Sequence, residues 1–198
     1  MYRGDFHRAM LPTPIGCVHL SVSNGCGGTT WALQQAKYIL MKDLHVIWIC
    51  DKIPDGDRFS QICSDLPPSL LSRLHVSANG DNTELGVKSG TRFLSGLSNI
   101  GLVIVDNWAP RSGKPPASLK KSMEELVNSC SAKKIPLIAI SSSYEDVANG
   151  GWKARSGLKS CEIWFLHKNE VDTMVREIHH GELVTRYRLD DEGFSPRN

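Results

Sequence analysis

The chain has 198 residues, 40% of them hydrophobic and 22% charged, with a formal net charge of +2. This length suits one globular domain and is too short for two full domains, so we expect a flexible segment over residues 1–14 and a single core domain over residues 15–198. The sequence has no apolar run of about 18 residues and carries charges near its amino terminus, which excludes a membrane span and a signal peptide and predicts a cytoplasmic protein.

Apolar runs of strand length alternate with segments of helical periodicity as far as residue 140. The expected strands lie at residues 17–22, 45–50, 102–105 and 136–140. The expected helices lie at residues 29–42, 57–66, 85–97 and 118–132, the second and third with the weaker pattern. Strands that alternate with helices are typical of an α/β fold with a mainly parallel sheet.

The pattern changes after a Gly-rich segment at residues 149–157. Alternating residues, typical of half-buried strands, follow at residues 161–166, 173–178 and 183–189. The last two segments flank Gly181, which can adopt the positive φ that a tight hairpin requires. The sequence therefore predicts a parallel central sheet flanked by helices, with an antiparallel C-terminal hairpin.

Cysteine and histidine spacing gives little support for a disulfide framework or a metal site. The six cysteines contain no C-x-x-C pair and lie mainly in apolar surroundings, at Cys17, Cys26, Cys50, Cys63, Cys130 and Cys161. His179 and His180 are adjacent, so on a strand they point to opposite faces and do not easily share one ion. Together with His167 they are more readily explained as turn or surface residues.

A degenerate phosphate-binding loop lies between the first strand and the first helix. Residues 23–30 read S-N-G-C-G-G-T-T where the intact motif reads G-x-x-x-x-G-K-[ST]. In the intact loop, backbone N–H groups surround phosphates, lysine neutralises them and the hydroxyl holds Mg²⁺. Thr29 takes the lysine position, and Thr30 the Mg²⁺ position. A Gly-rich turn between a strand and a helix is the plainer alternative.

The sequence around this loop resembles the RecA/RadA recombinase family, especially its short archaeal paralogue RadB. V-H-L-S-V precedes the loop and W-A-L-Q-Q-A follows it. Further matches occur in the family order: V-I-W-I at residues 46–49, R-F with Q-I at residues 58–62, L-V-I-V-D at residues 102–106, and R-Y-R-L-D-D-E-G-F at residues 186–194. The resemblance covers about residues 15–195 and implies a RecA-type P-loop fold.

The departures from the family fall on its catalytic positions. A catalytic glutamate is expected where this chain has Asp51 or Lys52, and a glutamine that senses the γ-phosphate where it has Ser143 in the triplet S-S-S. Phosphoryl transfer depends on positioning and charge stabilisation, so these changes predict little or no turnover. The degenerate nucleotide site consists of Ser23, Gly25, Gly27, Gly28, Thr29, Thr30 and Asp106. We expect that the protein requires no cofactor, with weak binding of ATP and Mg²⁺ as the alternative. If nucleotide binds, Thr30 and Asp106 are the expected Mg²⁺ ligands.

The resemblance also points to two candidate DNA-binding loops, one after each of the last two parallel strands. The segment from residue 111 to residue 159 has nine basic and four acidic residues, a local charge of +5. Basic residues interleaved with an aromatic suit single-stranded DNA, where cations meet phosphates and a ring stacks on a base. A solvated, cationic surface is the alternative. The candidate residues are Arg111, Lys114, Lys120, Lys121, Trp152, Lys153, Arg155 and Lys159.

The function that the resemblance implies is that of a nearly inactive recombinase paralogue, an accessory or mediator in homologous recombination and DNA repair. Its expected partners are a RadA-type recombinase or another RecA-fold paralogue in a homo- or hetero-oligomer, with single-stranded DNA and without a membrane. Phe6-His7-Arg8-Ala9 matches the spacing of the family's polymerisation segment. A slow DNA-dependent ATPase and a KaiC-like or Elongator-like regulatory or scaffold subunit are the alternatives.

Overall fold

The computed structural model describes residues 11–146 and 151–197, and the polymerisation-like segment lies outside them. The strands are β1 (Cys17–Val22), β2 (His45–Cys50), β3 (Leu74–Ala78), β4 (Ile100–Asp106), β5 (Leu137–Glu145), β6 (Trp152–Ala154), β7 (Glu162–Lys168), β8 (Val175–His180), β9 (Leu183–Asp190) and β10 (Gly193–Pro196). The helices are α1 (Gly28–Leu40), α2 (Gly56–Cys63), α3 (Pro68–Leu71), α4 (Thr83–Gly96) and α5 (Ala117–Ala132).

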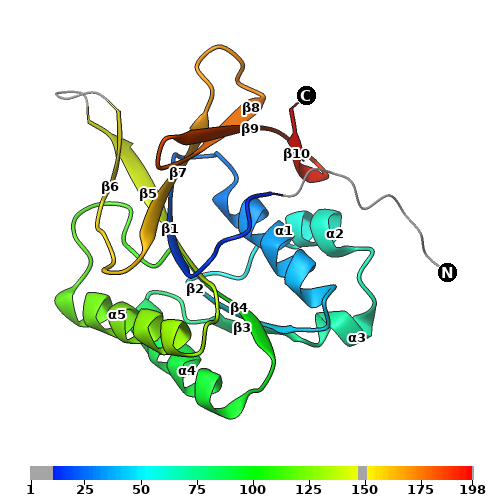
Figure 1. The fold of residues 1–198 in the computed structure, drawn as a ribbon, viewed down its shortest axis with the longest axis vertical. Coiled ribbons are helices and arrows are strands. Elements are labelled where there is room, and N and C mark those ends of the chain that lie inside the picture. Colours follow the sequence, from blue (N-terminus) through cyan, green and yellow to red (C-terminus); the bar gives the residue numbers. More distant parts are fainter. Residues whose placement is uncertain (1–10, 147–150, 198) are drawn as a thin grey trace.

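The strands form one sheet in the order β10-β9-β8-β7-β1-β5-β4-β2-β3, with β6 paired to β5 (Figure 1). Pairing is parallel from β3 to β7 and antiparallel from β7 to β10. Gly181 lies in the β8–β9 turn with a φ of 60°. The structure confirms the predicted fold class, including the C-terminal hairpin, and α/β crossovers explain why the parallel strands are apolar on both faces.

Two hydrophobic clusters cover the two faces of the sheet. Trp31 and Leu33 of α1 pack with Trp48 of β2 on one face, where α2 also lies. Val87 of α4 and Met123 of α5 pack on the other face (Figure 1). Each fully buried Leu- or Met-sized side chain contributes about 1.5–3 kcal/mol through removal from water. In the part of the chain that the structure describes, no helix is both long enough and apolar enough to cross a membrane.

Four short elements were not predicted: α3, β3, β6 and β10. The strand β3 lies at the sheet edge, where none of its residues is fully buried, and its polar His75 and Ser77 weaken the apolar signal. The strand β10 has four residues and depends on α1, because the Gln34 side chain donates to the Phe194 carbonyl (3.0 Å) and accepts from the Phe194 amide (2.8 Å). Such edges are specified by tertiary contacts more than by local pattern.

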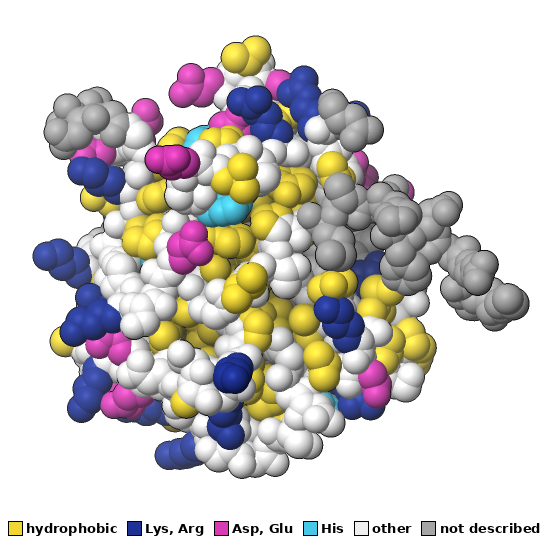
Figure 2. Space-filling view, viewed as in Figure 1, with side chains coloured by type: hydrophobic (Ala, Val, Ile, Leu, Met, Phe, Trp, Pro, Cys, Tyr) yellow, Lys and Arg dark blue, Asp and Glu magenta, His cyan; other side chains and the backbone are white. Residues whose placement is uncertain are grey.

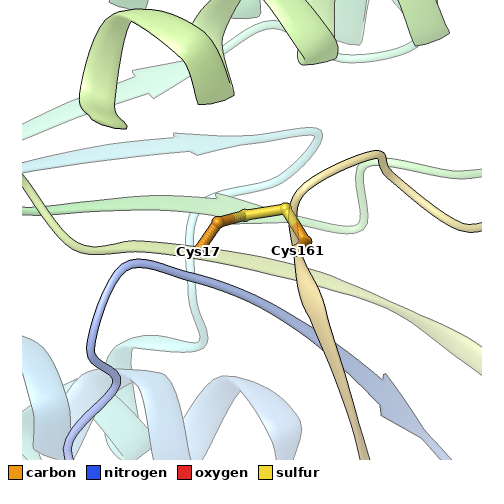
Figure 3. Close-up of a disulfide and its surroundings, with 2 residues drawn as sticks. All are labelled: Cys17 and Cys161. Carbon is orange, nitrogen blue, oxygen red and sulfur yellow. A yellow bond between two sulfur atoms is a disulfide. The ribbon is translucent and has the colours of Figure 1, made fainter. Parts of the chain in front are cut away.

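The structure contains a disulfide that the cysteine spacing did not predict. Cys17 and Cys161 are bonded, although 144 residues separate them (Figure 3). The cause is sheet topology: β1 and β7 are parallel neighbours, with Val18 opposite Glu162, so the two preceding cysteines meet with a Cα–Cα distance of 4.6 Å. The remaining cysteines are free and buried, as expected for small apolar residues, at Cys26, Cys50, Cys63 and Cys130.

Candidate phosphate-binding cleft

The loop between β1 and α1, which carries the predicted phosphate-binding motif, is a glycine-dependent turn at the start of a helix. Gly27 is the N-cap of α1 in the left-handed conformation (φ 86°, ψ 31°). A Cβ on Gly27 would lie 2.8 Å from Leu189 Cδ2, and a Cβ on Gly28 would lie 2.8 Å from Val22 Cγ2. Glycine is therefore favoured at Gly27 by conformation and packing, and at Gly28 by packing against Val22. The first N–H groups of a helix have no partner within the helix, so the start of α1 is suited to bind an anion in the cleft.

Gly27→Ala is expected to destabilise the fold by about 3 kcal/mol, because alanine would meet both a left-handed backbone and the Leu189 side chain. Gly25→Ala is the matched control, since Gly25 also has a positive φ of 68° but has open space around its Cβ position. Its expected cost is about 1–2 kcal/mol. Urea unfolding monitored by tryptophan fluorescence measures both values. Equal losses in the two variants would contradict the packing role of Gly27.

Thr29 and Asp106 meet where an intact loop would hold its lysine and metal. The Thr29 hydroxyl donates a 2.9 Å hydrogen bond to Asp106 Oδ2 at the end of β4. Asp106 is buried, and this burial, with the nearby charge of Asp51, raises its pKa to about 6 despite the bond from Thr29. Thr30 is also buried, in the first turn of α1. Burial disfavours the charged form of this carboxylate, and a bound cation would offset that cost.

The loop and the ends of β4 and β5 enclose a cleft of about 430 Å³. Arg111 from the loop before α5 and Arg155 from the segment after β6 both line it. Lys52, next to Asp51 after β2, is exposed and does not line the cleft. A guanidinium is always charged at neutral pH and binds phosphate oxygens through two N–H groups. The tertiary structure therefore supplies two cations to a cradle that lacks its lysine.

The positions that the resemblance assigns to a catalytic base and a γ-phosphate sensor hold Asp51 or Lys52 and Ser143. Asp51 follows β2, and its Oδ1 accepts a 3.3 Å hydrogen bond from the Asn107 side chain. Ser143 lines the cleft and is hydrogen-bonded to Ser23 across it (Oγ–Oγ 3.1 Å). Neither serine can span the distance that a glutamine side chain covers. The walls of the cleft thus include serine hydroxyls at the place where the resemblance leads us to expect a glutamine.

A buried histidine lies under the cleft, and the sequence pattern did not single it out. His19 is in the middle of β1 and fully buried; its Nε2 lies 2.7 Å from Ser141 Oγ, and its ring meets Trp108 edge-on at 5.5 Å. Burial lowers the pKa of His19 to about 4, so the imidazole is neutral at physiological pH. The sequence signal that could have identified this residue is a histidine in the middle of an otherwise apolar strand.

The candidate DNA-binding residues lie in different surroundings. Arg111, Lys114, Lys121 and Lys159 are exposed, and Lys120 is half-buried. Figure 2 shows Lys and Arg side chains along the left margin, over the amino-terminal end of α5 and the loop before it. The remaining candidates have partners: Lys153 is paired with Asp146, Arg155 lies over the Tyr144 ring, and Trp152 stacks on His167.

Comparison with known proteins gives structural but not sequence matches. No family model matches the chain, and no curated protein matches it. A crystal structure of the RadB recombinase superimposes with a TM-score of 0.72 and 20% identity, covering 94% of this chain and 92% of that chain. A DnaB-like replicative helicase, solved to study its interactions with primase, has a TM-score of 0.67 and 12% identity, covering 94% of this chain and 58% of the helicase. The chain therefore has the RecA-type α/β fold that RadB recombinase also has.

Proposed function

We propose that this chain is a cytoplasmic accessory or mediator protein of homologous recombination and DNA repair, with little or no ATPase activity. The observation that carries the proposal is the loop between β1 and α1: Gly27 caps α1 in a left-handed conformation, and Thr29, at the lysine position of the motif, bonds to Asp106. A protein with a RecA fold and this change can keep the surfaces that bind protein partners and DNA in the family and still lose ATP hydrolysis. A RadA-type recombinase or another RecA-fold paralogue is the proposed partner.

The cleft itself favours one alternative, a slow ATPase with weak ATP and Mg²⁺ binding. Arg111 and Arg155 both line the cleft with the loop, so positive charge is present although the lysine is not. Thr30 and Asp106 are the residues suited to Mg²⁺ beside a bound nucleotide. Retained binding and lost turnover are compatible, because ground-state phosphate contacts do not by themselves stabilise the transition state.

The basic residues around the cleft support binding to single-stranded DNA. The two loops that carry them follow β4 and β5, at the carboxyl edge of the parallel sheet where the phosphate loop also lies. Because Lys114, Lys121 and Lys159 are exposed, they can reach phosphates without breaking internal contacts. Trp152 stacks on His167, so a base would have to use its other ring face or displace the histidine.

Binding to single-stranded DNA is expected to weaken steeply as salt rises, with a slope of about 0.7 for each phosphate contact released. Alanine at four loop positions should flatten the slope and weaken binding for all sequences. Thermal stability should change little at Arg111, Lys114 and Lys153, because exposed charges contribute little to folding, and any loss should come from Arg155, which is half-buried over the Tyr144 ring. Fluorescence anisotropy across a salt series measures both effects. The four changes are Arg111→Ala, Lys114→Ala, Lys153→Ala and Arg155→Ala.

A matched control removes four exposed positive charges from other parts of the surface. It carries Lys42→Ala, Arg92→Ala, Lys133→Ala and Lys134→Ala. The control has the same net charge as the loop variant. Equal losses of affinity in the two proteins would therefore show that the loops are not the DNA-binding site. A wild-type protein without affinity for single strands at low salt would contradict the DNA-binding proposal itself.

Affinity capture from native cell extract tests the partner. Recovery of a RecA-type recombinase is the expected result, because the accessory role requires direct contact with one. Recovery of a kinase or of a tRNA-modifying complex would instead favour the KaiC-like or Elongator-like alternative. The loop variant described above serves as a second bait, since loss of DNA binding should not remove a partner that binds through protein contacts.

A further inference from the structure

Three polar side chains gather on one face of the β7–β8 hairpin. His167 of β7 is directly opposite Glu177 of β8 in the antiparallel register, and His179 lies two residues beyond Glu177. Side chains that face each other across a pair, or are two apart on one strand, share a face of the sheet. Their potential ligand atoms all lie within 4.8 Å of one another. Figure 2 shows histidine side chains in the region of β7, β8 and β9.

The carboxylate of Glu177 is held in a fixed orientation. Asn169 and Arg186 each donate a 2.8 Å hydrogen bond to Oε1, while Oε2 faces the histidines, 3.2 Å from His179 Nε2. Glu177 is buried, and its carboxylate is held by side chains from three neighbouring positions of the same sheet face. Oε1 is thus anchored by two hydrogen bonds, and Oε2 is directed at the imidazoles.

His167 has the tautomer that a metal ligand needs. Its Nδ1 lies 3.1 Å from the Lys168 carbonyl oxygen, which can only accept, so this nitrogen carries the proton and Nε2 keeps its lone pair. A backbone carbonyl on the second ring nitrogen is the usual partner of a metal-bound histidine. The ring is fixed from the other side by Trp152, stacked at 5.5 Å with an interplanar angle of 20°.

We propose that His167, Glu177 and His179 form a binding site for a divalent transition-metal ion, for which Zn²⁺ is the best match. Two imidazoles and one carboxylate are a donor set that zinc accepts in tetrahedral sites with an open fourth position. Glu177 Oε2 and His179 Nε2, 3.2 Å apart, already have a spacing suited to two ligands of one ion, and side-chain rotation would bring the His167 donor atom to the same ion. His179 is one-third exposed at its side chain, which leaves an entry path from solvent.

The neighbouring histidine explains why sequence spacing pointed away from a metal. His180 lies on the opposite face of β8, where its ring packs on Trp164 at 4.8 Å. The expectation that His179 and His180 face apart agrees with this arrangement. The partner of His179 is instead His167, 12 residues away in sequence and 4.4 Å away between ring centroids. A bound ion would tie β7 to β8 and fix the ring under Trp152.

Cobalt(II) titration of the chelator-treated full chain tests the site. We expect one ion per chain, visible absorption bands of a tetrahedral Co²⁺ centre, displacement by Zn²⁺, and a melting temperature that rises with Zn²⁺ concentration. His167→Ala and His179→Ala should lower the affinity by more than about 100-fold, beyond the range typical of second-shell changes. Glu177→Gln keeps the side-chain size and should lower it at least about 10-fold.

Two histidine variants outside the cluster are the matched controls. His180→Ala removes the adjacent histidine on the other face of β8. His75→Ala removes one member of a second close pair, in which His75 Nε2 lies 2.9 Å from His45 Nδ1. Both should bind Co²⁺ like the wild-type chain. No saturable binding by the wild-type chain, binding retained in folded Glu177→Gln and His179→Ala, or binding lost in His75→Ala would each overturn the assignment.

Discussion

Asp106→Asn is expected to raise the free energy of unfolding by about 3 kcal/mol at about pH 8 and to have no such effect at about pH 4. Asp106 has a pKa of about 6 in the folded chain against an ordinary value of 3.8. Between these values the native state holds the proton and the unfolded state does not, so stability falls as pH rises through 6. Asparagine is neutral throughout and avoids this loss.

His19 contributes the opposite pH dependence. Its pKa is about 4 in the folded chain against an ordinary value of 6.5, so the unfolded state binds the extra proton between these values. The stability that comes from a neutral buried imidazole is complete above pH 6.5 and falls by about 3 kcal/mol as pH drops to about 4. Asp106 and His19 therefore nearly cancel between pH 4 and 6 in the wild-type chain.

Urea unfolding at several pH values separates the two groups. The unfolding free energy of Asp106→Asn, relative to wild type, should fall as the solution is acidified, whereas that of His19→Gln should rise. Each variant can also carry a constant offset from altered packing, so the slope with pH is the informative quantity. Parallel pH profiles for wild type and Asp106→Asn would contradict an Asp106 that titrates near 6.

ATP turnover by the purified chain is expected to be at least about 100-fold below that of a RecA-fold recombinase with an intact phosphate loop. Thr29 lacks the ammonium group of the motif's lysine, so the transferred phosphoryl group loses charge stabilisation. In addition, no glutamate or glutamine occupies the expected base and sensor positions. Phosphate release in a coupled assay, with and without single-stranded DNA, measures the rate.

Thr29→Lys alone should not restore hydrolysis. The substitution returns the cation but leaves Lys52 exposed and outside the cleft, and leaves Ser143 too short to sense a γ-phosphate. Arg111→Ala with Arg155→Ala is the complementary variant, because it removes the cations that line the cleft and should weaken nucleotide binding in either background. Brisk Mg²⁺-dependent turnover by Thr29→Lys would show that the base and sensor assignments are wrong.

The sequence by itself determined the parallel core and its loop. Apolar runs bounded by turn residues predicted β1, β2, β4 and the first part of β5, because strands buried on both faces are mostly apolar. Glycine and threonine spacing placed the degenerate cradle between β1 and α1. Short edge strands such as β3 escaped prediction because their residues alternate between partial burial and exposure, which leaves a weak pattern.

Only the tertiary structure decided which distant side chains meet. Parallel pairing of β1 with β7 brings Cys17 to Cys161, and antiparallel pairing of β7 with β8 brings His167 to Glu177 and His179. Arg111 and Arg155 reach one cleft from loops that follow different strands. Local periodicity records the burial of each residue but not its partner across the sheet, since register and strand order are fixed by long-range contacts.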